Sequence, residues 1–134
     1  MYLVDDKDQV VALSTIPQSS VGAPIPLILA DEFVTVVAYY TQEADIEPND
    51  LDETIAIVSF KRCYAHMFGP PNDEAFHGHP LASRGLRPYS AFLIRNSSWL
   101  RRLTVMNSVH PYHSPKLFED YNHFILSFHD LTFE

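Results

Sequence analysis

Extended segments far outnumber helical ones in this chain, and this imbalance is the strongest constraint on its fold. Runs rich in β-branched and aromatic residues, bounded by turn residues, are typical of β-strands; they lie at 9–16, 32–41, 54–64, 89–96 and 123–128. Because helices do not alternate with these strands, the order of elements argues against a parallel, doubly wound sheet. We therefore expect an α+β domain with a mainly antiparallel β-sheet and one substantial helix, at about 97–108, packed on it. The run at 32–41 is almost continuously apolar, which predicts a central strand buried on both faces.

One segment has the apolar spacing of an amphipathic helix. Trp99, Leu103 and Met106 fall on one helical face, which predicts that this face packs on the sheet. Asn96 or a neighbouring serine supplies the N-cap, because a side-chain oxygen there accepts a free backbone N–H of the first turn. Pro111 ends the helix, since proline lacks the backbone N–H that a helix interior requires.

The length and composition indicate a single domain covering residues 1–134. A chain of 134 residues of which 46 % are hydrophobic is long enough to bury its own core. Cys63 is the only cysteine, so no internal disulfide forms, as expected in a reducing cytoplasm. The longest apolar stretch is interrupted by Asp31 and Glu32 and is too broken to span a bilayer. We expect a soluble cytoplasmic protein.

Charge is distributed unevenly along the chain. Residues 1–60 contain eleven Asp/Glu and one Lys, whereas residues 61–134 contain eight Lys/Arg and six Asp/Glu, and the net charge is -8. An acidic surface repels phosphate backbones, which disfavours nucleic-acid binding. The acidic residues, including a predicted charged loop at 43–53, either keep a small domain in solution or steer a basic protein partner to the first half.

A long irregular connection follows Met67. Residues 67–88 contain four of the ten prolines and three of the four glycines, and no periodicity. Connections of this length are usually functional or disordered. Its phenylalanines, with Leu81 and Leu86, supply apolar side chains to bury, so we expect it to be ordered. We also expect it to bring distant imidazoles beside the exit of the 97–108 helix.

Histidines are the candidate metal ligands. They form two close pairs, His77 with His79 and His110 with His113. In an extended segment the two rings of His-x-His lie on one side, and three-residue spacing in a turn also brings two rings together. If the pairs meet, alone or with Glu74 or Asp130, they suit zinc, iron or nickel. The alternative is that these histidines are ordinary polar residues of proline-containing turns.

His129 and Asp130 are weak candidates for a catalytic base and its orienting carboxylate. Adjacent side chains of a strand point to opposite faces, so the two cannot pair unless a turn intervenes. We therefore expect Asp130 to cap a terminal turn instead.

Five further residues are candidates for binding: Asp73, Glu74, Arg84, Arg87 and Trp99. The acidic pair could act near the histidines, but Asn-Asp-Glu after two prolines more often begins a turn. The arginines match anions, although they could equally reach the acidic first half of the chain. Trp99 could stack on a ligand, but at the start of an amphipathic helix it is more often a core residue.

Three long motifs in the second half resemble a family of small, uncharacterised bacterial proteins. They are FGPPNDEAFHGHPLASRGLRPY, NSSWLRRLTVMNSVHPYH and HFILSFHDLTFE, and together they cover roughly residues 67–134. The resemblance implies a bacterial origin and a shared fold, and it transfers no mechanism. Members of the family usually continue past the final Phe-Glu into a cysteine, so the resemblance predicts a chain clipped at its C-terminus.

These observations favour a small acidic binding or regulatory module with a protein partner on its first half. An immunity-type role rests on analogy alone. The alternative is a small metal-dependent enzyme that uses the four paired histidines. A third prediction is a homodimer formed by pairing exposed strands.

Overall fold

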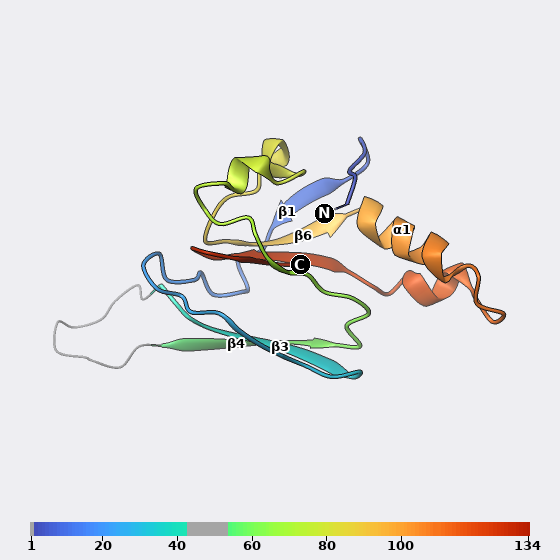
Figure 1. Ribbon diagram of the computed structural model, residues 1–134, viewed down its shortest axis with the longest axis horizontal. Coiled ribbons are helices and arrows are strands. Elements are labelled where there is room, and N and C mark those ends of the chain that lie inside the picture. Colours follow the sequence, from blue (N-terminus) through green and yellow to red (C-terminus); the bar gives the residue numbers. More distant parts are fainter. Residues whose placement is uncertain (1, 43–53) are drawn as a thin grey trace.

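Two antiparallel β-sheets and one α-helix form the part of the chain that the computed structural model describes, residues 2–42 and 54–134 (Figure 1). The expected α+β class with mainly antiparallel sheet is confirmed. The predicted charged loop at 43–53 lies outside the described residues. No helix within the described ranges is long and apolar enough to cross a membrane.

The larger sheet has five strands in the order β1-β6-β7-β8-β5, and each neighbouring pair is antiparallel. Its strands are β1 (Gln9–Ala12), β5 (Phe68–Gly69), β6 (Ala91–Arg95), β7 (His123–Ser127) and β8 (Thr132–Phe133). In β7 all side chains except Phe124 are buried, so alternate residues face two different apolar layers. The middle of this sheet is therefore covered on both faces.

The smaller sheet has the order β2-β3-β4 and consists of β2 (Leu27–Ala30), β3 (Val34–Tyr40) and β4 (Ile55–Lys61). In β3, Thr35, Val37 and Tyr39 are buried and the residues between them are only partly buried. The prediction that this segment is buried on both faces is wrong. Its β-branched residues suit a strand in either setting, and whether a second layer covers the strand is decided by the rest of the fold.

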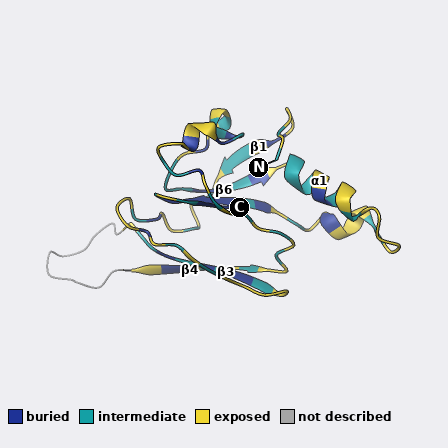
Figure 2. Cartoon of the chain, in the orientation of Figure 1, coloured by how far each residue is buried: buried dark blue, intermediate teal, exposed yellow. Residues whose placement is uncertain are grey.

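Two apolar layers flank the five-stranded sheet (Figure 2). The layer between the two sheets is built from Val37, Tyr39, Ala56, Ala91, Leu126, Phe128 and Phe133. The layer on the opposite face is built from Phe76, Leu81, Leu86, Phe92, Ile94 and Ile125. The irregular connection covers this second layer with two short 3-10 turns, η1 (Phe76–Gly78) and η2 (Ala82–Arg84). It lies on the sheet because its apolar side chains are buried there.

The helix α1 (Ser98–Asn107) starts where β6 ends. The Ser97 side chain accepts a hydrogen bond from the Leu100 backbone N–H over 3.2 Å, so Ser97 is the N-cap of α1. Of the two predicted caps, Asn96 or a neighbouring serine, the serine is confirmed. Leu103 is buried, but Met106 is 65 % exposed. The prediction that Met106 packs on the sheet is wrong, because the second half of α1 projects past the sheet (Figure 1). A short turn, η3 (Pro115–Phe118), follows the helix.

Candidate ligand site between the two sheets

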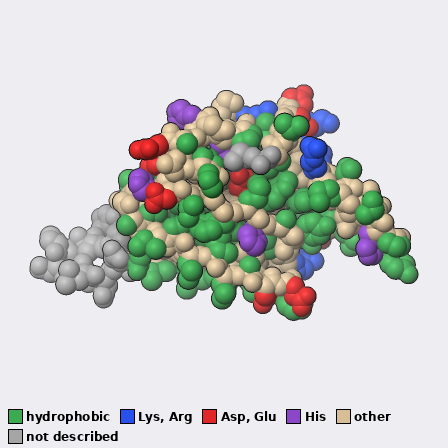
Figure 3. All heavy atoms as spheres, in the orientation of Figure 1, with side chains coloured by type: hydrophobic (Ala, Val, Ile, Leu, Met, Phe, Trp, Pro, Cys, Tyr) green, Lys and Arg blue, Asp and Glu red, His purple; other side chains and the backbone are tan. Residues whose placement is uncertain are grey.

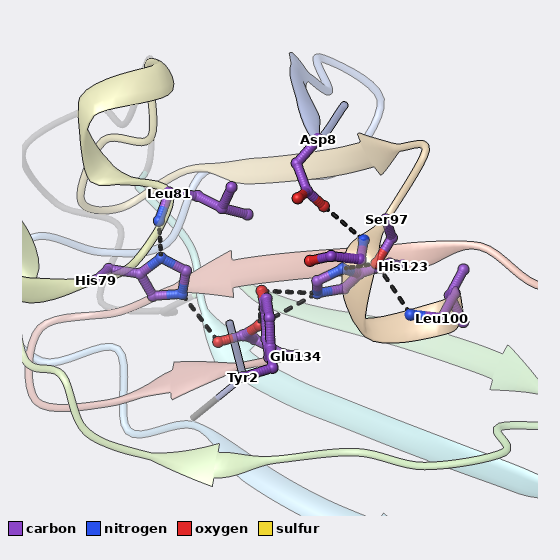
Figure 4. A network of polar contacts seen from close by, with 9 residues as sticks. Tyr2, Asp8, His79, Leu81, Ser97, Leu100, His123 and Glu134 are labelled. Carbon is purple, nitrogen blue, oxygen red and sulfur yellow. Dashed lines mark hydrogen bonds and ion pairs between the residues drawn. The ribbon is translucent and has the colours of Figure 1, made fainter. Parts of the chain in front are cut away.

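A buried carboxylate receives three hydrogen bonds on the face of the five-stranded sheet that the irregular connection covers (Figure 4). Glu134 Oε1 lies 2.9 Å from His79 Nε2. Glu134 Oε2 lies 3.1 Å from His123 Nε2 and accepts a 2.7 Å hydrogen bond from the Tyr2 hydroxyl. We call Tyr2, His79, His123 and Glu134 the buried carboxylate cluster. Its members come from the N-terminal segment, the irregular connection, β7 and the residue after β8, so the cluster joins four distant parts of the chain.

In both histidines the Nε2 atom faces Glu134, and the hydrogen bonds of the Nδ1 atom indicate which nitrogen carries the ring hydrogen. His79 Nδ1 accepts the Leu81 backbone N–H over 3.1 Å, so the hydrogen of this ring is on Nε2. His123 Nδ1 lies 2.8 Å from Ser97 Oγ, which already accepts the Leu100 N–H and can donate its own hydrogen to the ring. The hydrogen-bond network thereby assigns an Nε2–H donor to both histidines. The N-cap of α1 and the buried carboxylate are linked through one imidazole.

The charge of Glu134 is stabilised by these donors. Burial by itself raises the pKa of this carboxyl, but hydrogen bonds from His123, His79 and Tyr2 outweigh that effect and lower the pKa to about 2. Burial, together with the neighbouring negative charge of Glu134, raises the pKa of the Tyr2 phenol, which therefore remains a donor. The cluster holds a carboxylate anion within apolar surroundings.

Aromatic rings enclose one side of this cluster. The Tyr2 and Trp99 rings are stacked with their centroids 5.5 Å apart and their planes 4° apart. The Trp99 ring meets the His123 ring edge-on at 5.0 Å. Such contacts add stability beyond the burial of area. The ring face of Trp99 that Tyr2 covers therefore packs within the protein and cannot stack on a ligand.

A cavity of about 350 Å³ lies between β4, α1 and the five-stranded sheet. Its apolar lining includes Ile16, Val58, Phe60, Trp99, Leu103, Phe124 and Phe133. Its polar lining includes Glu134, His123 and Asn122, with Lys61, Arg62 and Asp120 also contributing. This volume is at the lower end of the roughly 300–1,000 Å³ typical of small-molecule sites. Apolar walls with a few convergent polar groups are also typical of such sites.

A second polar cluster lies elsewhere, on the surface. His129 Nδ1 is 3.0 Å from Asp73 Oδ2, and the Tyr89 hydroxyl donates to the same Asp73 oxygen. The hydrogen bond from Tyr89 lowers the pKa of Asp73, with help from the Glu74 N–H and His129 and against the effect of burial, and the same bond raises the pKa of Tyr89 to about 12. Tyr89 has a φ of 58°, a backbone conformation that few tyrosines adopt. Asp73 therefore has a role beyond beginning a turn.

The carboxylate partner of His129 is not Asp130. Asp130 Oδ1 is 4.0 Å from His129 Nε2, and its side chain is 80 % exposed. The adjacent pair therefore makes no close dyad, whereas Asp73, which is far away in sequence, supplies one. His129 itself is 42 % exposed, so its ring opens to solvent. Whether His129 acts in catalysis is not tested by these contacts and stays a prediction.

The four candidate metal ligands do not converge. His77 is exposed and His79 is buried against Glu134. His110 Nδ1 accepts the Tyr112 N–H, and His113 Nδ1 contacts Asn107 over 3.0 Å. Within residues 2–42 and 54–134, no three His, Cys, Asp or Glu side chains are placed to share a metal ion. The assumption of an extended His-x-His segment is wrong, because residues 76–78 form a 3-10 turn and its two rings part.

The acidic first half is partly used within the molecule. Asp5 pairs with Arg101, and Asp8 Oδ1 accepts the Ser98 N–H over 2.6 Å at the start of α1, where a negative charge is favourable. Arg84 Nη1 donates to the backbone carbonyls of Asp5 and Asp8. Arg84 thus contacts the backbone of the acidic segment and not the carboxylates of that segment. A protein partner on this half stays a prediction.

The remaining binding candidates have ordinary surface positions. Glu74 is exposed, and its backbone N–H donates to Asp73 Oδ1 over 2.8 Å. Arg87 is also exposed, and its carbonyl accepts a hydrogen bond from the Ser127 hydroxyl. The structure brings neither side chain to the inter-sheet cavity.

Sequence reasoning missed three members of the buried carboxylate cluster: Tyr2, His123 and Glu134. Their positions in the chain are far apart, and no spacing rule connects them. One signal was present: His123 and Glu134 are polar residues that border apolar strand segments, where an unpaired polar group is costly. The connection of these two with His79 also draws residues from the first and third of the long motifs. Comparisons with family models, curated proteins and solved structures gave no significant match.

Proposed function

We propose that the protein is a binding module whose ligand is a small molecule with an apolar body. The observation that carries this proposal is the 350 Å³ cavity, whose wall is largely apolar. Apolar walls with a few polar groups are typical of small-molecule sites. Phe60, Phe124 and Phe133 offer ring surfaces to a flat or branched apolar group.

The head group of the ligand is expected to be uncharged. The lining contains two cations, Lys61 and Arg62, and two acidic residues, Asp120 and Glu134, so its formal charges balance. The Glu134 side chain is only 3 % exposed and already accepts three hydrogen bonds. A charged ligand would lose its hydration without a dedicated partner, which is costly. We therefore expect a neutral small molecule with an aromatic or branched body to bind better than an amine or an acid of the same size.

Two single residues of the chain report on this cavity. Trp99 is the only tryptophan and Cys63 the only cysteine, and both line it. A titration would compare 2-phenylethylamine, 2-phenylethanol and phenylacetate, which share a body and differ in charge. The neutral 2-phenylethanol is expected to change Trp99 fluorescence saturably and to slow alkylation of Cys63 at the lowest concentration, because the other two compounds must give up the hydration of a charge.

A cavity-blocking variant gives the specificity control. Ala65→Phe places a ring in the cavity lining, whereas Ala75→Phe adds the same ring at an exposed position. Binding should be lost in the first variant and kept in the second. If none of the three compounds changes either reporter, or if Ala65→Phe binds as well as the unmodified protein, the small-molecule function is wrong.

A further inference from the structure

The outer face of the three-stranded sheet is apolar, and no residue within 2–42 or 54–134 covers it. Its outward side chains include Leu27 and Leu29 on β2 and Ile55 and Ile57 on β4, and the exposed fractions of these four lie between 54 % and 73 %. The register places them in rows, since Leu27 pairs with Ala38 and Ala38 pairs with Ile57. Figure 3 shows hydrophobic side chains gathered along the lower rim of the molecule, over this sheet. Scattered exposed leucines are ordinary, but rows of them on one face are not.

Among the residues that the structure describes, charged side chains lie at the ends of this face and not within it. Lys61 ends β4, and Asp31 and Glu32 lie in the turn between β2 and β3. The centre of the face therefore has no charge with which to select a charged partner. Its chemistry is complementary to another apolar, flat sheet face of similar size.

The dimensions of the face allow a weak association between copies. Three strands about 4.8 Å apart span roughly 14 Å, and at about 3.3 Å per residue the two seven-residue strands β3 and β4 are roughly 23 Å long, whereas β2 has four residues. This flat outline, at most about 320 Å² per copy, is smaller than the roughly 800 Å² per partner of a standard interface. Protruding leucine and isoleucine side chains enlarge it, and we expect the dimer to be weak.

We propose that this face binds the same face of a second copy of the chain. A two-fold axis through the centre of β3 would place each copy's rows against the partner's rows, as an isologous interface requires. The two sheets would pack about 10 Å apart, the usual spacing of stacked sheets, and would bury β3 on its second face. This arrangement differs from the pairing of strand edges, because the contacts are made by side chains and not by backbone hydrogen bonds.

Matched charge insertions test the proposal. Ile57→Lys puts a charge in the centre of the face, and Val105→Lys puts one on α1; the two parent side chains are 70 % and 69 % exposed. Sedimentation velocity over a range of protein concentrations would measure the dimer dissociation constant of each protein. The unmodified chain is expected to dimerise, Ile57→Lys to weaken the dimer at least about tenfold, and Val105→Lys to leave it unchanged.

Folding is monitored in the same samples by circular dichroism and thermal unfolding. Both substitutions replace side chains that are exposed in a single copy, so both variants are expected to remain folded. Added salt should strengthen the dimer, because it screens the net charge of -8 on each copy. An unmodified chain that stays monomeric at every concentration would overturn the proposal. So would a dimer that survives Ile57→Lys or that dissociates in Val105→Lys.

Discussion

Replacing Glu134 with glutamine should destabilise the fold in a pH-dependent manner. The pKa of Glu134 is about 2 in the folded protein, against an ordinary value of 4.5 in the unfolded chain. Each pKa unit corresponds to about 1.4 kcal/mol, so the buried carboxylate contributes about 3 kcal/mol above pH 5. Because the folded pKa is the lower one, this contribution is present above the unfolded pKa and is lost as pH falls through the folded pKa.

Glutamine keeps the shape of Glu134 but cannot accept all three hydrogen bonds. Its amide group must face either His79 or the His123–Tyr2 pair, and His79 cannot change tautomer without losing its hydrogen bond from the Leu81 N–H. The variant is therefore expected to be about 3 kcal/mol less stable near pH 6, and this difference should shrink to near zero at pH 2.

Urea unfolding followed by Trp99 fluorescence at several values between pH 2 and pH 6 measures this difference. Glu119→Gln is the matched control, because Glu119 is exposed, and its effect should stay below about 0.5 kcal/mol throughout. A Glu134→Gln penalty that is the same at pH 6 and pH 2 would refute the reasoning, since it would then arise from packing and not from charge.

Four further outcomes follow from the described contacts and exposures. Ser97→Ala removes both the N-cap of α1 and a hydrogen bond to a buried imidazole, so urea unfolding should show a loss of about 1–2 kcal/mol. Asp73→Asn removes the carboxylate that holds the phenol of Tyr89, so ultraviolet titration should show the pKa of Tyr89 falling from about 12 toward 10. Phe128→Ala empties the inter-sheet core, where Phe128 is 2 % exposed, and should cost about 3–5 kcal/mol. Leu117→Ala, at a side chain 58 % exposed, should change stability by less than about 0.5 kcal/mol in the same assay.

Local pattern was sufficient for most of the secondary structure. The β-branched runs became β3, β4, β6 and β7, and the helix formed within one residue of the predicted 97–108 at each end. These elements depend on side-chain shape and on spacing over a few residues, which a sequence displays directly. Ser97 is a further example, because an N-cap is chosen by its immediate neighbours.

The local sequence pattern was misleading about whether the second face of a strand, or the far end of a helix, is buried. The apolar residues of β3 predicted burial on both faces, yet alternate side chains of this strand are only partly buried. Met106 shares a helical face with the buried Leu103, yet Met106 itself is largely exposed. Amphipathic spacing states which side of an element is apolar. It does not state how far the neighbouring layer extends.

The candidate sites illustrate the same division. His79 was noticed because a second histidine lies two residues before it, but its partner is Glu134, and His77 points elsewhere. His129 was noticed beside Asp130, but it contacts Asp73. The His77–His79 pairing is wrong because nearness in sequence does not give nearness in space, whereas the expectation that His129 and Asp130 form no close pair agrees with their 4.0 Å separation. Neither true partner, Glu134 or Asp73, could be found from local spacing.

The amino-acid sequence by itself determined the α+β class, the positions of the main strands, the single helix and its cap, since these follow from short-range sterics and periodicity. Only the tertiary structure decided that two histidines and a tyrosine converge on Glu134, that a cavity lies between the sheets, and that no described segment covers one face of the smaller sheet. Those features depend on which layers pack together, and the free energy that selects this packing is shared among side chains separated by most of the chain.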